Sequence, residues 1–239
     1  MIKHLLGSRE MLLVAVIIAL LALIATRFPA FITLQNLASV FNDTSPLMIL
    51  AIGQMMVILT RSIDLSVAAN LALTGMIVAM LNVSMPDLPI PVIVLLSVLI
   101  GAVMGMVNGL LVWTLALPSI VVTLGTMTIY RGIIFVISGG DWVNSHEMSD
   151  SFKAFARNEL LGLPLLSWAA VLAITVFMVF MNRAPVGRAL YAVGGNPHAA
   201  VYTGISVGRC QFWAFTLSGA LAGLTGYLWV SRYAVAYVD

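Results

Sequence analysis

The chain has 239 residues, of which 62% are apolar and 8% are charged, and its mean hydropathy is +1.09. Soluble globular domains carry about 25% charged residues, and a domain of this size leaves much of its surface in water. The net charge of +2 comes from scattered basic residues without a stripe that could bind nucleic acid. The composition therefore excludes soluble enzymes, nucleic-acid-binding modules and disordered chains, and it predicts an all-α, polytopic membrane protein.

Seven apolar stretches follow one another along the chain, at residues 11–26, 46–60, 65–81, 91–113, 120–137, 164–181 and 210–230. A membrane-spanning helix needs about 20 residues of this kind, so we expect a single transmembrane domain over residues 1–239 with about seven spans. No small-residue cleavage site follows the first stretch, which we interpret as an uncleaved span rather than a signal peptide. Because the chain stops just beyond the seventh stretch, we also expect it to be truncated at the C-terminus.

The charges of the loops predict how these spans are oriented. The loop at 183–209 carries Arg183, Arg188 and Arg209 and no acid, whereas the loop at 138–163 carries four acids against two bases. Cytoplasmic loops are enriched in Lys and Arg. We therefore place the N-terminus and loop 183–209 in the cytoplasm and loop 138–163 in the periplasm, and seven alternating crossings satisfy both placements.

Regularly spaced glycines indicate where two spans pack closely. Gly101, Gly105 and Gly109 recur every four residues on one helical face, and Gly219 and Gly223 repeat the spacing in the seventh stretch. Small residues at this spacing let two helix backbones approach each other in lipid. We interpret the glycines as helix-packing positions.

A charged interruption, RSIDLSV at residues 61–67, separates the second and third stretches. The preceding run of 15 residues would rise about 22 Å, which is short for a hydrocarbon core of about 30 Å. Interruptions inside a membrane are tolerated where they line a cavity or are buried in protein, and they mark transport sites. Asp64 or Ser66 can cap the following helix. The alternative is an ordinary cytoplasmic turn closed by an Arg61–Asp64 ion pair.

Other polar residues lie inside the apolar stretches. Arg131 either faces the interior of the bundle or extends toward the membrane surface, because a charge at depth is costly. Gln54, Asn108 and Thr123 can hydrogen-bond either a sugar hydroxyl or a neighbouring helix. With Asp64 and Ser66, these residues are the candidates for a substrate path.

The basic loop contains signals for a short helix outside the membrane. Gly194 and Gly195 interrupt the chain, Asn196 is a good N-cap, and Pro197 suits the first helical position. A helix over 197–203 would end at Gly204. Because so short a helix is unstable alone, it must pack on a partner protein, on the chain's own loops or at the membrane interface.

Motifs for catalysis are weak. Neither Lys3 nor Lys153 follows a glycine, so the chain has no Walker A loop. The run GISVG at 204–208 matches G-x-S-x-G but follows a predicted helix instead of a strand. The single cysteine, Cys210, excludes an internal disulfide and a cysteine-cluster metal site. The three histidines lie in separate segments, so we expect no metal site.

Four segments resemble the permease subunits of bacterial ABC importers for monosaccharides, the group that includes ribose, xylose, rhamnose and autoinducer-2 permeases. RSIDLSVA at 61–68 is similar to the family's GGIDLSVG, with Arg61 and Ser62 in place of two glycines. Asn108-Gly109 with PSIVVTLG at 118–125, and Tyr130-Arg131-Gly132 with Ser138-Gly139-Gly140, follow in the expected order. Residues 187–205 resemble the G-R-x-x-Y-A-x-G-G-N-x-x-A-A-x-x-x-G-I loop. Within the group we favour the rhamnose and autoinducer-2 subgroups.

The resemblance implies a non-enzymatic subunit of the bacterial inner membrane that passes a monosaccharide from a periplasmic sugar-binding protein to the cytoplasm. It implies as partners a separate ABC ATPase subunit that binds the ATP, a second permease copy or paralogue, and membrane lipid, with no cofactor in this chain. The residues expected to couple to the ATPase are Gly187, Arg188, Gly194, Gly195, Asn196, Pro197, Ala199, Ala200 and Gly204.

Two other functions stay open at this point. The chain could be an ion-coupled secondary transporter that uses Asp64 and Arg131 as a charge relay. It could also be an intramembrane serine hydrolase that acts through Ser206.

Overall fold

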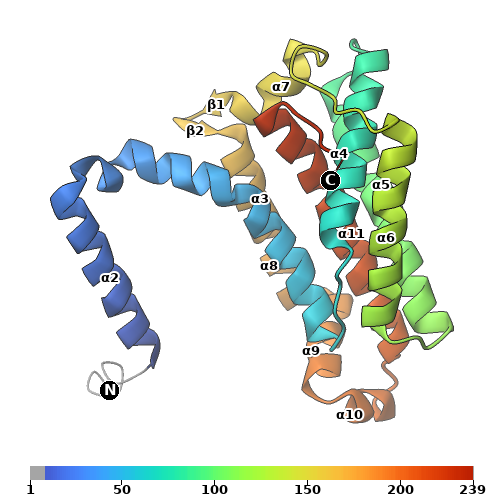
Figure 1. Cartoon of the computed structure of the whole chain (residues 1–239). Helices are drawn as coiled ribbons and strands as arrows, with labels where there is room; N and C mark the ends of the chain where they lie inside the picture. The colour runs from blue at the N-terminus through green and yellow to red at the C-terminus, as the bar shows by residue number, and fades with distance from the viewer. Residues whose placement is uncertain (1–8, 239) are drawn as a thin grey trace. The chain divides into compact units, whose positions relative to one another are not determined.

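A computed structural model describes residues 9–238, and helices make up almost all of its regular structure (Figure 1). The chain divides into two compact units, residues 1–44 and 45–239. In the first unit, α2 (Arg9–Arg27) is followed by the 3₁₀ helix η1 (Pro29–Ile32) and by the beginning of α3 (Leu34–Leu59). The proline at the start of η1 suits a first helical position, where its missing N–H costs nothing.

The second unit holds the rest of α3 and the elements that follow it. These are α4 (Val67–Ser84), α5 (Ile90–Thr114), α6 (Ser119–Ser138), α7 (Asp150–Arg157), β1 (Glu159–Leu160), β2 (Leu163–Pro164), α8 (Leu165–Arg183), α9 (Pro185–Gly195), α10 (Pro197–Tyr202) and α11 (Val207–Tyr233). The two strands form one short antiparallel hairpin. Proline precedes α5, α6 and α8, and Gly139 ends α6 with a left-handed backbone, φ +65°.

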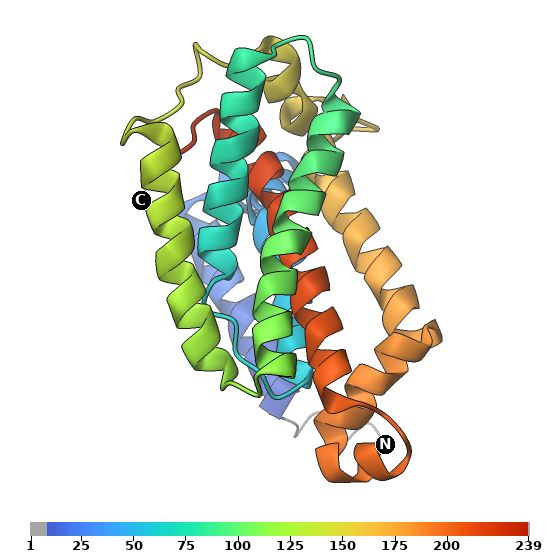
Figure 2. The ribbon, with the colours of Figure 1, turned by 90° about the vertical axis from the view of Figure 1, so that its right-hand side faces the viewer.

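The long helix α11 lies in the middle of the second unit, against α5 and α4 (Figure 2). Glycines line its crossing with α5: a Cβ added at Gly101 would overlap the Gly219 carbonyl oxygen, and one added at Gly105 would overlap that of Phe215. At Gly109 an added Cβ would lie 2.8 Å from Phe212 Cα. The two backbones therefore meet through glycines spaced four residues apart on each helix.

Five of the described helices, α3, α4, α5, α6 and α8, are long and apolar enough to cross a membrane. The seven apolar stretches of the sequence each fall on a helix, the first on α2 and the seventh on α11. An all-α membrane architecture is thereby confirmed. The number of seven spans, the single-domain organisation and the orientation of the chain stay predictions.

The two ends of the second unit differ in structure, as Figure 2 shows: α9 and α10 lie at one end, and α7 lies at the other. Phe152 anchors α7 because its fully buried ring meets the ring of Tyr227 edge-on at 5.0 Å. Asn82 at the end of α4 exchanges two hydrogen bonds of 2.9 Å with Ser149, the N-cap of α7. Helix α7 is therefore attached to α4 and α11 at the end where the sequence predicts the periplasm.

Candidate functional site: an interrupted polar segment and two short helices

Residues 60–66 form a non-helical connection between α3 and α4. Their side chains alternate: Ser62, Asp64 and Ser66 are buried, whereas the residues between them are exposed. Such alternation is expected of extended backbone, in which successive side chains point to opposite sides. Near its start, Arg61 has a φ of +57°, in the left-handed region that glycine adopts without strain. A row of polar side chains thus enters a bundle of apolar helices.

Asp64, Ser66 and Asn108 form a buried hydrogen-bonded chain. The Ser66 backbone N–H and hydroxyl donate to Asp64 Oδ1 at 2.8 and 2.6 Å, and Asn108 Nδ2 donates to Ser66 Oγ at 2.8 Å. Asn108 is 1% exposed, and its Oδ1 accepts no hydrogen bond from the described residues. This series of hydrogen bonds ends at Asn108 Oδ1, a buried acceptor with capacity for one more donor.

Ser66 is the N-cap residue of α4, but its side chain makes no cap hydrogen bond to that helix. The predicted capping role of Asp64 or Ser66 is therefore replaced by the bond from the Ser66 N–H to the Asp64 carboxylate. The extended segment itself is held by side chains from two helices: Gln54 Nε2 donates to the Asp64 carbonyl at 3.2 Å, and Thr123 Oγ1 lies 3.2 Å from the Ile63 carbonyl. Five candidate path residues thus lie in one network.

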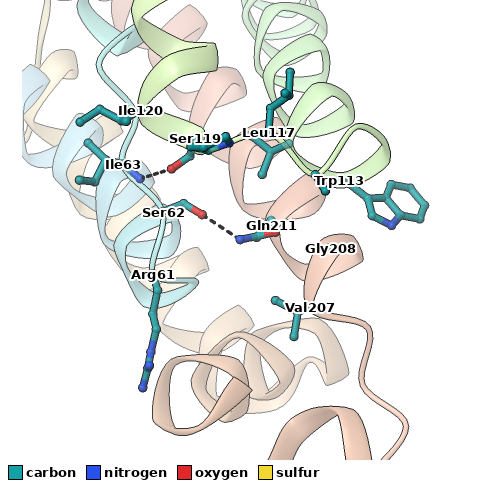
Figure 3. Close-up of a pocket in the computed structure, with 13 residues that line it drawn as sticks. Arg61, Ser62, Ile63, Trp113, Leu117, Ser119, Ile120, Val207, Gly208 and Gln211 are labelled. Carbon is teal, nitrogen blue, oxygen red and sulfur yellow. Dashed lines mark hydrogen bonds between the residues drawn. The ribbon is translucent and has the colours of Figure 1, made fainter. Parts of the chain in front are cut away.

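A cavity of about 670 Å³ adjoins this segment where α5 turns into α6 (Figure 3). Ser119 Oγ accepts the Ile63 N–H at 3.0 Å, and Gln211 Nε2 donates to Ser62 Oγ at 3.2 Å on the cavity lining. Binding sites for small molecules have volumes of about 300–1,000 Å³ and combine apolar walls with a few polar groups. The cavity is large enough for a small polar molecule.

Arg131 lies apart from this network. Its side chain is exposed on α6, and Gly132 beside it would meet no atom within 4 Å if it carried a Cβ. The arginine therefore faces the outside of the second unit instead of the bundle interior, and the structure does not bring it to Asp64. The charge relay required by an ion-coupled mechanism is absent from the contacts of the described residues.

The basic loop folds into two short helices. Helix α10 begins where the sequence predicts it: Asn196 Oδ1 accepts the Ala199 N–H at 3.1 Å, and Pro197 is the first helical residue. Gly204 follows the helix with φ +83°. Ala200 is 4% exposed and packs inward, whereas Tyr202 is 91% exposed. One side of α10 therefore packs on the chain itself and the other side faces outward.

Gly187, Arg188, Gly194 and Gly195 belong to α9, a helix that the sequence analysis treated as loop. A Cβ at Gly187 would lie 2.6 Å from Met181 Cα, and a Cβ at Gly194 would lie 2.6 Å from the Leu59 carbonyl oxygen. Close approach of backbones explains both glycines. Arg188 donates to the Arg183 carbonyl at 2.8 Å, across the junction of α8 and α9.

Arg61 does not form the ion pair with Asp64 that the alternative of an ordinary turn includes. Its guanidinium donates instead to the carbonyl oxygens of Gly194, at 3.3 and 3.2 Å, and of Gly195, at 3.1 Å. These carbonyls belong to the last turn of α9, where helical partners are missing. The ordinary-turn interpretation of residues 61–67 is therefore wrong in its ion pair.

Ser206 of the G-x-S-x-G run is the N-cap of α11, and its Oγ accepts the Arg209 N–H at 3.4 Å. The run lies between α10 and α11. A nucleophile elbow requires a strand before the serine, so this context does not fit a hydrolase.

Sequence reasoning missed several residues of the site. Ser119 and Gln211 contact residues 62–63 because the first turns of α6 and α11 lie beside the polar segment at one end of the unit. Ser119 carried a usable signal, because it lies in the run PSIVVTLG at 118–125 that resembles the permease family. Gln211 and the Arg61 contacts carried none, because residues 61 and 194 lie far apart in the sequence.

Together, the apolar helices, the buried polar interruption and the two short helices at one end define a polytopic membrane protein built around a polar segment. Residues 36–239 match the family model described as "branched-chain amino acid transport system / permease component". The chain belongs to this family of transport permeases.

The names of individual relatives specify a substrate more closely than the family description does. The chain is 36% identical over 231 residues to an autoinducer 2 import system permease protein of Enterobacter sp. strain 638, covering 96% of this chain and 66% of the relative. It is 32% identical over 233 residues to the Salmonella typhi autoinducer 2 import system permease protein, covering 97% and 66%. With the ribose import permease protein of Haemophilus influenzae it shares 33% identity over 236 residues, covering 98% and 72%. No solved structure matches.

The chain thus spans 66% of the length of the autoinducer-2 relatives it matches. The predicted resemblance to sugar importer permeases and the multi-pass, inner-membrane character of the chain are confirmed by the family and by these relatives. The family description names amino acids, whereas the relatives import sugars or autoinducer 2.

Proposed function

We propose that the chain is the membrane-spanning permease subunit of an ATP-driven importer for a small polyhydroxylated molecule of the autoinducer-2 or monosaccharide class. The observation that carries this proposal is the polar segment 60–66, buried between apolar helices in a chain of this permease family. Irregular backbone at membrane depth requires protein or a cavity around it. The autoinducer-2 and ribose relatives support the substrate class.

The network offers the chemistry that such a substrate needs. Hydroxyl groups both donate and accept hydrogen bonds, and Asn108 Oδ1 is a buried acceptor with capacity for a donor. Ser62, Ser119 and Gln211 supply further polar groups at the cavity. These groups replace the water that a sugar loses, while neutral hydrogen bonds of about 0.5–1.5 kcal/mol net each allow its release.

In the proposed importer another subunit binds the ATP, and residues 1–239 themselves contain no Walker A sequence. The outward side of α10 supports a docking role for residues 183–209. Val201 and Tyr202 are exposed there beside Ala199. Exposed aromatic and apolar side chains on a short helix are typical of protein contacts. We assign this side to an ABC ATPase partner.

The remaining partners follow from the same assignment. A periplasmic binding protein would deliver the substrate at the end that carries α7. A second permease copy or paralogue would cover the exposed face of α6, where Arg131 lies among apolar residues. Lipid would cover the other apolar faces.

Reconstitution tests the proposal. The full-length complex, with its ATPase and binding protein in proteoliposomes, should take up labelled ribose, rhamnose or autoinducer 2 only when ATP is supplied on the ATPase side. Uptake driven by a proton or sodium gradient without ATP would contradict the proposal and favour the ion-coupled alternative. Liposomes that contain the ATPase and binding protein without this chain are the control.

A further inference from the structure

Among the described residues, the Arg61 side chain forms its hydrogen bonds with the last turn of α9, which lies far away in the sequence. One guanidinium donates to the carbonyl oxygens of both Gly194 and Gly195, at distances from 3.1 to 3.3 Å. A cation at a helix C-terminus is also favoured by the helix dipole. In Figure 3 the Arg61 side chain extends away from the cavity, toward the helices at this end.

Backbone packing joins the same two places, the end of α9 and the residues at and after the end of α3; we call this contact the junction. Gly194 lies so close to the end of α3 that an added Cβ would be 2.6 Å from the Leu59 carbonyl oxygen. At the other end of α9, Gly187 lies equally close to Met181 in α8. Helix α9 is therefore held at both ends, and its C-terminal end meets the residues that begin the polar segment.

The junction lies between the two parts of the site. Asn196, which caps α10, comes directly after Gly195. Ser62, which is bonded to Gln211, comes directly after Arg61. The end of α9 thus meets the start of the buried segment through the Arg61 side chain, beside the backbone contact of Gly194 with the end of α3.

We propose that Arg61 is a positioning residue that couples movement of α9 and α10 to residues 62–66 of the polar segment. This inference rests on the proposed function, because it assigns to Arg61 the transmission of the ATPase's movement. It predicts that loss of the side chain uncouples ATP hydrolysis from uptake. A residue that only stabilised the fold would instead lower the amount of assembled complex.

The test replaces Arg61 by Gly in the full complex and measures uptake and ATP hydrolysis in the same proteoliposomes. Glycine suits the left-handed backbone, with φ of +57° at this position, so the substitution removes the side chain without adding strain. We expect the number of molecules taken up per ATP to fall about fivefold or more, the size of a typical coupling between two sites. Arg61→Lys keeps the charge but not the planar fork, and should give an intermediate ratio.

Arg27→Ala is the control, because Arg27 is an exposed arginine at the end of α2, outside the polar segment and outside residues 183–209. A wild-type ratio in the Arg61→Gly complex, or an equal fall in the Arg27→Ala complex, would overturn the inference. If the wild-type complex itself showed no ATP-dependent uptake, the proposed function would fail instead.

Hydrogen exchange gives a second readout that does not need uptake. Binding of the partner ATPase should change the exchange of backbone amides at 60–66 in the wild type, and this change should disappear in Arg61→Gly while the change at 197–202 remains. The same change at 60–66 in both proteins would overturn the inference.

Discussion

Asp64 organises the polar segment at the scale of single residues. The carboxylate is 8% exposed and holds both the backbone N–H and the hydroxyl of Ser66. Hydrogen bonds to charged groups contribute about 1.5–3 kcal/mol each, and partners left unpaired in a buried place add a further penalty. The conformation of the segment therefore depends on this one carboxylate.

Asp64→Ala should lower ATP-dependent uptake by about tenfold or more, since about 1.4 kcal/mol corresponds to a factor of ten. Asp87→Ala is the control, because Asp87 is exposed in the loop between α4 and α5. Uptake is normalised to the amount of protein in the membrane. Equal uptake by the two variants would remove Asp64 from the path.

Substitutions at two neighbouring alanines in α10 can test ATPase docking and folding separately. Ala199 is exposed, whereas Ala200 is buried. Ala199→Glu should leave the protein folded and abolish co-purification of the ATPase, because it adds a charge on the outward side. Ala200→Glu should lower the melting temperature of the purified permease, because it buries an unpaired carboxylate. Retained ATPase binding by Ala199→Glu would count against the docking role.

At the scale of elements, the crossing of α5 and α11 decides how closely the bundle packs. The glycines there face backbone atoms of the opposite helix, whereas Gly125 and Gly132 on α6 face open space. Spacing alone identified the glycines of α5 and α11 as packing positions, because repeats of four residues place small side chains on one helical face. It did not reveal that the two groups of glycines in α5 and α11 face each other.

Gly105→Val should destabilise the purified protein by about 1–3 kcal/mol or prevent its folding, since the new side chain overlaps the Phe215 carbonyl. Gly132→Val should be tolerated, because an added Cβ would meet nothing within 4 Å there. Thermal unfolding in detergent, followed by size-exclusion chromatography, measures the difference. Equal melting temperatures for both variants would contradict close packing at this crossing.

The sequence predicted elements well where composition or capping alone decides them. Apolar length located the membrane helices, and Asn196, Pro197 and Gly204 located α10 to within one residue. Helix α7 was missed although Ser149 caps it, because its amphipathic pattern lies inside a polar loop. The contacts of Arg61 with Gly194 and of Ser62 with Gln211 were beyond sequence reasoning, since they depend on how separate helices pack.

At the scale of the whole molecule, the proposed function depends on which side of the membrane carries α9 and α10. These helices lie at one end of the second unit and the loop before α7 lies at the other (Figure 2). Loop charges place the first end in the cytoplasm, because arginines accumulate there without acids. An ATPase can act on α10 only if this placement holds.

A single cysteine introduced in place of one or the other of two exposed histidines tests the orientation of the protein in the membrane directly. His198 lies in α10, and His146 lies in the loop before α7. Cys210 is buried and the only native cysteine, so a Cys210→Ser background is suitable. In intact cells whose outer membrane is permeable to the reagent, a maleimide that does not cross the inner membrane should label His146→Cys but not His198→Cys. Disruption of the inner membrane should then expose His198→Cys to the label. Labelling of His198→Cys in intact cells would place α10 outside, where no ATP is available, and would exclude the ATP-driven mechanism.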